Sequence, residues 1–191
     1  MKNYLNFETE IKKLDEEIEK LKDPYDQEGL SQVKTEKIEK MQLDLDEKIK
    51  KIYSKLDPLQ TTQVARHEDR PKASFFINNL FEDLVFLSGD RYYGEDLAVM
   101  TGFAKFNKRS VLVIGQDKGE DLESRIEKNF GMMRPEGYRK TIRLMKLADK
   151  FNIPVISFID TPGAYPGVGA EERGQAEAIA RSIECCMNLT V

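Results

Sequence analysis

The run from Pro154 to Gln175 constrains the fold of this chain more than any other segment. Residues 154–160 are apolar and β-branched apart from Ser157, which is typical of a strand covered on both faces. Three glycines follow within seven residues, at positions 163, 167 and 169, and a stretch rich in Ala and Glu comes next. Glycine lets main-chain N–H groups approach a ligand, and loops at the carboxyl ends of buried strands bind ligands in α/β proteins. The run therefore predicts a strand, a ligand-binding loop and a helix.

The rest of the carboxyl-terminal part predicts further strands and helices. The segment 71–87 is apolar and aromatic and is predicted to be helical near its middle. Two strands are predicted at 98–106 and 110–115, with a turn at 107–109 between them. Pro135 is predicted to open a helix, a position that favours proline, and a last helix is predicted over 171–187 with Ala176, Ile179, Ala180, Ile183 and Met187 on one stripe. This order predicts an α/β fold, with a mainly parallel sheet for the strands that helices connect.

The first 57 residues have a different character, because nearly half of them are charged. Apolar residues recur at helical spacing over 11–21 and again over 38–59, and residues 23–29 between the two stretches are typical of a turn. The pattern predicts an antiparallel hairpin of two amphipathic helices, as a domain over 1–58 that precedes a second domain over 59–191. The hairpin could be a docking arm for a partner subunit or a local cap on the core, and the sequence leaves both open.

Composition excludes several classes of function. The net charge is −4 with 34% charged residues, so the chain lacks the basic excess that nucleic-acid binding requires. No apolar run approaches the roughly 20 residues of a membrane span, and the amino terminus lacks an apolar signal region, which predicts a cytoplasmic protein. Cys185 and Cys186 are adjacent, which predicts two buried free thiols and no metal site.

Familiar catalytic and nucleotide-binding patterns fail on this chain. Asp160-Thr161-Pro162-Gly163 has the form of a GTPase switch motif, but no phosphate-binding P-loop precedes it. The glycine spacing after 167 does not fit the dinucleotide-binding pattern. His67 is the only histidine and is predicted to be a structural hydrogen-bonding group, and no Ser-His-Asp or Cys-His arrangement is present.

A basic stripe lies on the helix predicted from Pro135, at Arg139, Arg143, Lys146 and Lys150. These residues share one helical face. They could meet the phosphates of a nucleotide-like ligand such as coenzyme A, or they could form a solvated face. Acids at 171, 172 and 177 are explained by the helix dipole alone.

The segments IDTPGAYPGVGAEERGQAEAIAR, NFGMMRPEGYRK and LSGDR together resemble the carboxyltransferase α-subunit family of bacterial acetyl-CoA carboxylase. The resemblance covers essentially the whole chain. It implies an incomplete crotonase-like fold of ββα units behind the helical hairpin. It also implies transfer of a carboxyl group from carboxybiotin, held on a separate biotin carboxyl carrier protein, to acetyl-CoA. The product would be malonyl-CoA for fatty acid biosynthesis, within an ATP-binding carboxylase complex. The implied partner is a β subunit in an α2β2 assembly, and the zinc of the family belongs to that β subunit.

The resemblance also identifies candidate site residues. It implies that the biotin-side pocket is lined by Gly163, Ala164, Tyr165, Pro166, Gly167 and Gly169. Main-chain N–H groups there would hold an oxyanion, so no catalytic side chain is assigned; the alternative is a structural turn that packs strand against helix. Arg134, Glu136, Gly137 and Tyr138 are predicted to support the site or an interface.

Two departures from the family pattern affect what the resemblance implies. Gln116-Asp117 stands where the family tends to have His-Gln, and the family's paired-glycine loop, which would follow Val191, is not in these 191 residues. We therefore expect residues 1–191 alone to be inactive. Two alternatives remain: a related biotin-dependent acyl-CoA carboxyltransferase or decarboxylase, and a non-catalytic split or degenerate subunit that binds partner chains.

Overall fold

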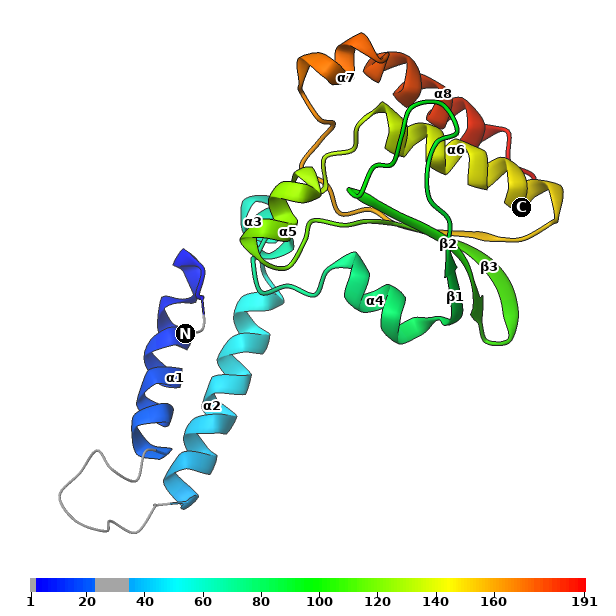
Figure 1. Cartoon of the computed structure of the whole chain (residues 1–191). Coiled ribbons are helices and arrows are strands. Elements are labelled where there is room, and N and C mark those ends of the chain that lie inside the picture. The colour runs from blue at the N-terminus through cyan, green and yellow to red at the C-terminus, as the bar shows by residue number, and fades with distance from the viewer. Residues whose placement is uncertain (1–2, 23–34) are drawn as a thin grey trace. The chain divides into compact units, whose positions relative to one another are not determined.

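The computed structural model describes residues 3–22 and 35–191 (Figure 1). The chain divides into two units, Met1–Arg70 and Pro71–Val191, and each is described by itself. The predicted domain division after residue 58 falls inside the first of these units.

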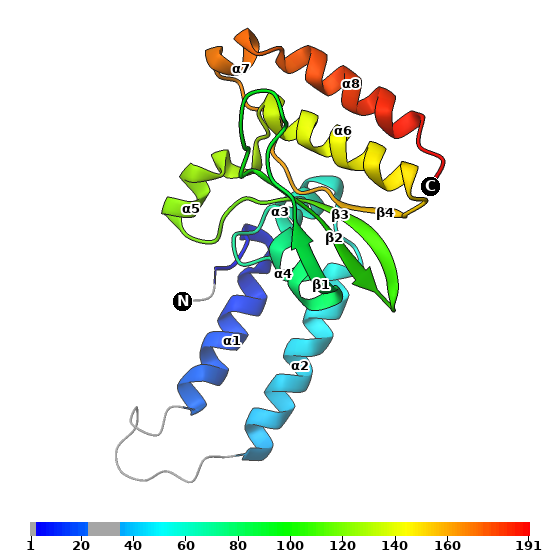
Figure 2. The ribbon, with the colours of Figure 1, turned by 45° about the vertical axis from the view of Figure 1, so that its right-hand side comes forward.

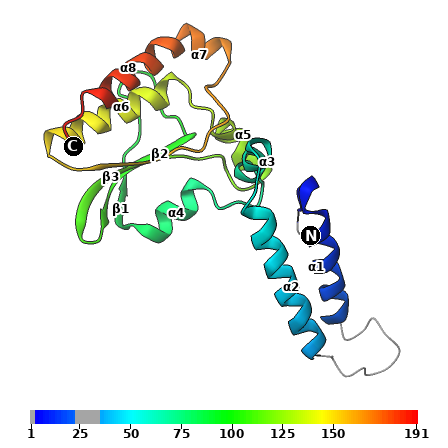
Figure 3. The ribbon, with the colours of Figure 1, turned by 180° about the vertical axis from the view of Figure 1, so that it is seen from behind.

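The first unit is helical, with η1 (Asn6–Glu8), α1 (Thr9–Lys22), α2 (Thr35–Tyr53) and α3 (Pro58–Ala65). Helices α1 and α2 lie side by side (Figures 1 and 3) and share an apolar cluster around Ile11, Ile18 and Leu45. The predicted turn at 23–29 lies outside the described residues. The apolar stripe ends at Ile52 and not at Leu59, because Asp57 caps a new helix: its carboxylate accepts the Gln60 N–H at 2.7 Å.

His67 has a structural role inside this first unit. Its Nε2 lies 2.8 Å from the carbonyl oxygen of Asn3, and its Nδ1 accepts the backbone N–H of Asp69 at 3.1 Å. Both ring nitrogens therefore serve local backbone contacts, as the sequence predicted.

The second unit is built on a sheet in the order β1-β2-β3-β4. Its strands are β1 (Glu82–Phe86), β2 (Val99–Phe106), β3 (Arg109–Gln116) and β4 (Val155–Phe158). The first two pairings are antiparallel and the third is parallel. The prediction of parallel pairing for helix-linked strands is thus confirmed for β3 and β4. β2 and β3 are antiparallel because Asn107 and Lys108, both at positive φ, close a tight hairpin between them.

Two sequence predictions about the strands need correction. β1 was not predicted, because α4 (Ala73–Leu80) ends only two residues before it and the aromatic run conceals the change of structure. β4 was predicted to be covered on both faces, yet it stands at one end of the strand order and is only half-buried, with Ser157 exposed.

Helices cover both faces of the sheet (Figures 1 and 2). α4 packs on one face, where Ile77 meets Val111 and Val113 of β3. On the other face lies α6 (Pro135–Lys150), with Leu144 against Leu112 of β3. α8 (Gln175–Met187) packs along α6, and the short elements α5 (Leu122–Glu127) and η2 (Asn129–Gly131) connect β3 to α6. The alternation of side chains along β3 thus builds both cores.

The last predicted helix is two helices, α7 (Val168–Glu172) and α8, separated at Gly174. Gly174 has φ 80°, a conformation that favours glycine and that ends α7. On α8 the buried residues are Gln175, Ala178 and Cys185, whereas the predicted stripe through Ile183 and Met187 is exposed. Cys186 is exposed as well, so only one of the two thiols is buried as predicted.

Gly137 gives a sharp test of the packing at the start of α6. A Cβ at this position would lie 2.4 Å from Oδ2 of Asp96, a carboxylate that the N–H groups of Ala98 and Arg134 hold in place. We expect Gly137→Ala to lower the free energy of unfolding of the complete natural polypeptide by about 1–3 kcal/mol, since neither atom can move freely. Urea denaturation measures this.

Gly94→Ala is the matched control, because nothing lies within 4 Å of its Cβ position. We expect the control to change the unfolding free energy by less than about 0.5 kcal/mol. Equal losses for the two variants would contradict the packing described here.

Candidate functional site

The glycine-rich loop leaves β4 at Asp160, and its first residues are held by neighbouring segments. The backbone N–H of Asp160 donates to Oε1 of Gln116 at 2.8 Å, and the Asp160 carboxylate pairs with Lys118. Thr161 Oγ1 donates to the carbonyl oxygen of Gly131 at 2.8 Å. Gln116, which belongs to the Gln116-Asp117 pair that departs from the expected family pattern, therefore contacts the loop directly through its side-chain amide.

The middle of the loop is attached to the segment before α6. Ala164 forms a parallel bridge with Met133, and the Tyr165 N–H donates to the Met133 carbonyl oxygen at 3.1 Å. The Arg134 guanidinium carbon lies 4.6 Å from the centre of the Tyr165 ring, within range of a cation–π interaction. Gly167 meets the same ring, because a Cβ there would lie 2.2 Å from Cε1 of Tyr165. Tyr165 is thus fixed by an arginine and by a glycine backbone.

The same loop leaves main-chain donors available. Among the described residues, no acceptor forms a hydrogen bond with the N–H groups of Gly167, the N-cap of α7, or of Val168 and Gly169 in its first turn. Gly163 is exposed, with nothing within 4 Å of its Cβ position. An arrangement of this kind can stabilise negative charge on a ligand oxygen without help from an acid or base side chain.

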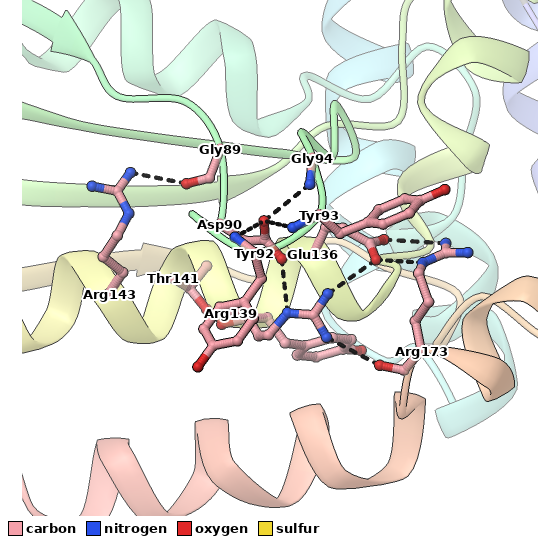
Figure 4. A network of polar contacts seen from close by, with 11 residues as sticks. Gly89, Asp90, Tyr92, Tyr93, Gly94, Glu136, Arg139, Thr141, Arg143 and Arg173 are labelled. Carbon is pink, nitrogen blue, oxygen red and sulfur yellow. Dashed lines mark hydrogen bonds and ion pairs between the residues drawn. The ribbon is translucent and has the colours of Figure 1, made fainter.

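A network of four charged side chains holds the far end of α7 (Figure 4). Arg139 Nε donates to Asp90 at 2.8 Å, and its two terminal nitrogens donate to Glu136 and to the carbonyl oxygen of Arg173. Arg173 Nε donates to Glu136 at 2.6 Å. Glu136 is only 2% exposed, so this carboxylate lies buried between two guanidinium groups.

Burial and hydrogen bonding compete at the acids around this network. Burial opposes the charged form of Asp90, but three backbone N–H groups and Arg139 outweigh it and lower its pKa to about 2. Burial also opposes the charged form of Glu136, but the hydrogen bond from Arg173, a backbone N–H and the charges of Arg173 and Arg139 together outweigh it and lower its pKa. At Asp96 burial prevails over the N–H donors of Ala98 and Arg134, and the pKa is raised.

The predicted basic stripe is neither a phosphate site nor a fully solvated face. Arg139 belongs to the network, and Arg143 donates to the carbonyl oxygens of Ser88 and Gly89 at 3.1 and 3.0 Å. Only Lys146 and Lys150 are solvated to the degree that the spacing suggested. Sequence reasoning missed Asp90, the partner of Arg139, because 49 residues separate the pair.

Lys140 is a second residue that the sequence did not single out. It is buried on α6, and its Nζ donates to the carbonyl oxygens of Asp96 and Val99 at 2.8 Å while pairing with Glu95. Its position between two stripe residues gave no signal of burial. Of the residues predicted to support the site, Arg134 contacts the loop and Glu136 belongs to the network. Gly137 instead lies against Asp96, and Tyr138 packs on the cluster of Ala98, Val99 and Met133.

Within 3–22 and 35–191, no group of three or more His, Cys, Asp or Glu side chains could hold a metal ion. In the same described residues, no helix is long and apolar enough to cross a membrane.

Comparison with known families gives a match over residues 4–191. The matching model is that of the acetyl co-enzyme A carboxylase carboxyltransferase-like family. The chain belongs to this family. The match includes the glycine-rich loop, the network of Figure 4 and the helices of the first unit.

Curated relatives of this chain carry names that agree with the family match. The chain is 77% identical over 191 residues to the acetyl-coenzyme A carboxylase carboxyl transferase subunit alpha of Pelagibacter ubique (strain HTCC1062), covering all of this chain and 52% of the relative. It is 50% identical to the protein of the same name from Chelativorans sp. (strain BNC1), covering all of this chain and 60% of that protein. The chain thus spans little more than half the length of these relatives.

Solved structures support the fold. One similar structure is transcarboxylase 12S with methylmalonyl-coenzyme A and methylmalonic acid bound. It matches with a TM-score of 0.52 at 23% identity, over 65% of this chain and 23% of that one. A single-chain, multi-domain long-chain acyl-CoA carboxylase matches with a TM-score of 0.53 at 22% identity, over 68% of this chain and 13% of that one. The predicted crotonase-like α/β fold is confirmed.

The depressed pKa of Asp90 predicts how stability depends on pH. The charged carboxylate contributes about 2 kcal/mol to the free energy of unfolding above pH 4. This contribution is lost as the pH falls towards the folded-state pKa of about 2. We expect the cost of Asp90→Asn, measured by urea unfolding, to be about 1–2 kcal/mol smaller at pH 2.5 than at pH 6.

Ser182→Ala serves as the control because it removes no titrating group. Its cost should stay constant over the same pH range. A cost of Asp90→Asn that does not change with pH would show that the carboxylate is not held in its charged form.

Proposed function

We propose that the polypeptide containing these residues is the α subunit of an acetyl-CoA carboxylase carboxyltransferase. It transfers a carboxyl group from carboxybiotin, held on a separate biotin carboxyl carrier protein, to acetyl-CoA, and so produces malonyl-CoA for fatty acid biosynthesis. It works with a β subunit, as an α2β2 assembly, in the cytoplasm. The observation that carries the proposal is the loop after β4, with available N–H groups in a chain of this family.

The residues of the loop fit a biotin ring. The ureido oxygen of biotin is a small hydrogen-bond acceptor, and the N–H groups at 167–169 are donors without an acceptor in the described chain. Gly163 leaves open space on the same loop, and Tyr165 presents an aromatic ring fixed by Arg134. When bound, carboxybiotin supplies the carboxyl group that is transferred.

This chain contributes binding and electrostatics. Each preorganised N–H donor to an oxyanion in a dry site is worth roughly 3–4 kcal/mol. The loop is preorganised because Asp160 is held by Gln116 at the end of β3, and Thr161 and Tyr165 are held by the backbone of residues 131–133. Gly163, Ala164, Tyr165, Pro166, Gly167 and Gly169 remain the proposed biotin-side lining.

A direct assay tests this function. The complete natural polypeptide, combined with the β subunit, is given malonyl-CoA and biotinylated carrier, and acetyl-CoA formation is measured. A parallel reaction with methylmalonyl-CoA in place of malonyl-CoA, in which propionyl-CoA formation is measured, identifies the acyl group. We expect turnover with the acetyl pair; preference for another acyl group would support the related carboxyltransferase, and a stable complex without turnover would support the non-catalytic subunit.

Tyr165 provides a test inside the loop. Tyr165→Leu removes the ring that Arg134 covers, an interaction of about 0.5–2 kcal/mol, so we expect the rate of carboxyl transfer to fall about tenfold. Tyr165→Phe keeps the ring and should retain most of the rate. Equal rates for Leu and Phe variants of equal stability would argue against a role of the ring in the site.

A further inference from the structure

The backbone of residues 88–94 is held rigidly from inside the protein. Oδ1 of Asp90 accepts the N–H groups of Tyr92, Tyr93 and Gly94 at 2.9, 2.8 and 3.0 Å. The Asp90 N–H in turn donates to the Gly94 carbonyl oxygen at 3.0 Å. Asp90 is 3% exposed, and the Arg139 ion pair fixes its second oxygen. The loop therefore presents its side chains from a preorganised backbone.

The two tyrosines that follow Asp90 point into solvent. Tyr92 is 89% exposed and Tyr93 is 70% exposed. Each ring nevertheless lies beside a guanidinium group of the network (Figure 4): the Arg139 carbon is 6.0 Å from the centre of Tyr92, and the Arg173 carbon is 4.4 Å from the centre of Tyr93. Exposed aromatic rings on a rigid support lose little entropy on binding, and Tyr and Arg dominate the energetics of protein interfaces.

The charge of this surface indicates the kind of partner. Arg139 and Arg173 are neutralised by Asp90 and Glu136, so the four side chains carry no net charge. The guanidinium N–H groups that contact these acids are unavailable for a phosphate. The two guanidinium groups beside the rings are therefore occupied, and exposed aromatic rings of this kind suit another protein better than the phosphates of coenzyme A.

The surface lies next to the proposed biotin loop. Arg173, under the Tyr93 ring, also faces Gly169, where a Cβ would lie 2.9 Å from the Arg173 Nη1 atom. The Arg173 side chain thus lies between Tyr93 and Gly169 of the loop. A protein domain that delivers biotin to the loop would reach these tyrosines at the same time.

We propose that Tyr92 and Tyr93 form a docking surface for the protein domain that carries biotin. The inference rests on the proposed function, because it takes the glycine loop as the biotin side of the site. The tyrosines act in recognition of the carrier and not on the reacting atoms.

The test compares biotin on its carrier with biotin attached to no protein. The complete α–β complex is assayed for carboxyl transfer from malonyl-CoA to biotinylated carrier and, separately, to free biocytin. We expect Tyr92→Ala to raise the KM for the carrier about tenfold and to leave kcat/KM for biocytin within twofold. Tyr93→Ala should also raise the KM for the carrier, whereas Tyr92→Phe, which keeps the ring, should have the wild-type KM.

Phe151→Ala is the matched control. Phe151 is 62% exposed, has a neighbouring cation in Lys150 at 5.9 Å, and follows the opposite end of α6. We expect this variant to leave the carrier KM unchanged.

Several results would overturn the docking surface. An unchanged carrier KM in Tyr92→Ala, an equal loss with carrier and biocytin, or weakened binding of the β subunit would each do so. Failure of the wild-type complex with both forms of biotin would instead refute the proposed function, so the two failures are distinguishable.

Discussion

The buried carboxylate of Glu136 is the contact on which the arrangement of the site depends. It lies in the first turn of α6 and accepts hydrogen bonds from Arg139 on the same helix and from Arg173 at the end of α7. An acid buried without partners would be costly, and here two guanidinium groups compensate it. The ion pair of Glu136 and Arg173 therefore fixes the end of α7 against α6, and so restrains the carboxyl-terminal end of the glycine-rich loop.

The other end of the loop is held by different means. The residues that leave β4 donate neutral hydrogen bonds to Oε1 of Gln116 and to the carbonyl oxygen of Gly131, and Asp160 forms an ion pair with Lys118. The loop is thus restrained at its start, at Tyr165 and beyond its end, while the N–H groups of 167–169 stay available. Rigid supports around open donors are what electrostatic stabilisation of an oxyanion requires.

Local patterns predicted part of this structure. Pro135 marks the start of α6, the two β-branched runs mark β3 and β4, and the glycines mark the loop. Long-range contacts were not predictable: Asp90 and Arg139 are 49 residues apart, and helical spacing alone placed Arg139 on a solvated or ligand-binding face. The buried face of α8 was missed for a related reason, since Cys185 packs on α6 about forty residues away, whereas Ile183 and Met187 are exposed.

A structure of the complete α–β complex with bound biotin shows directly whether the loop after β4 holds biotin. We expect the ureido oxygen to lie within hydrogen-bonding distance of at least one N–H group of residues 167–169. A biotin bound without contact to this loop would contradict it, and would leave the glycines as a structural turn between β4 and α7.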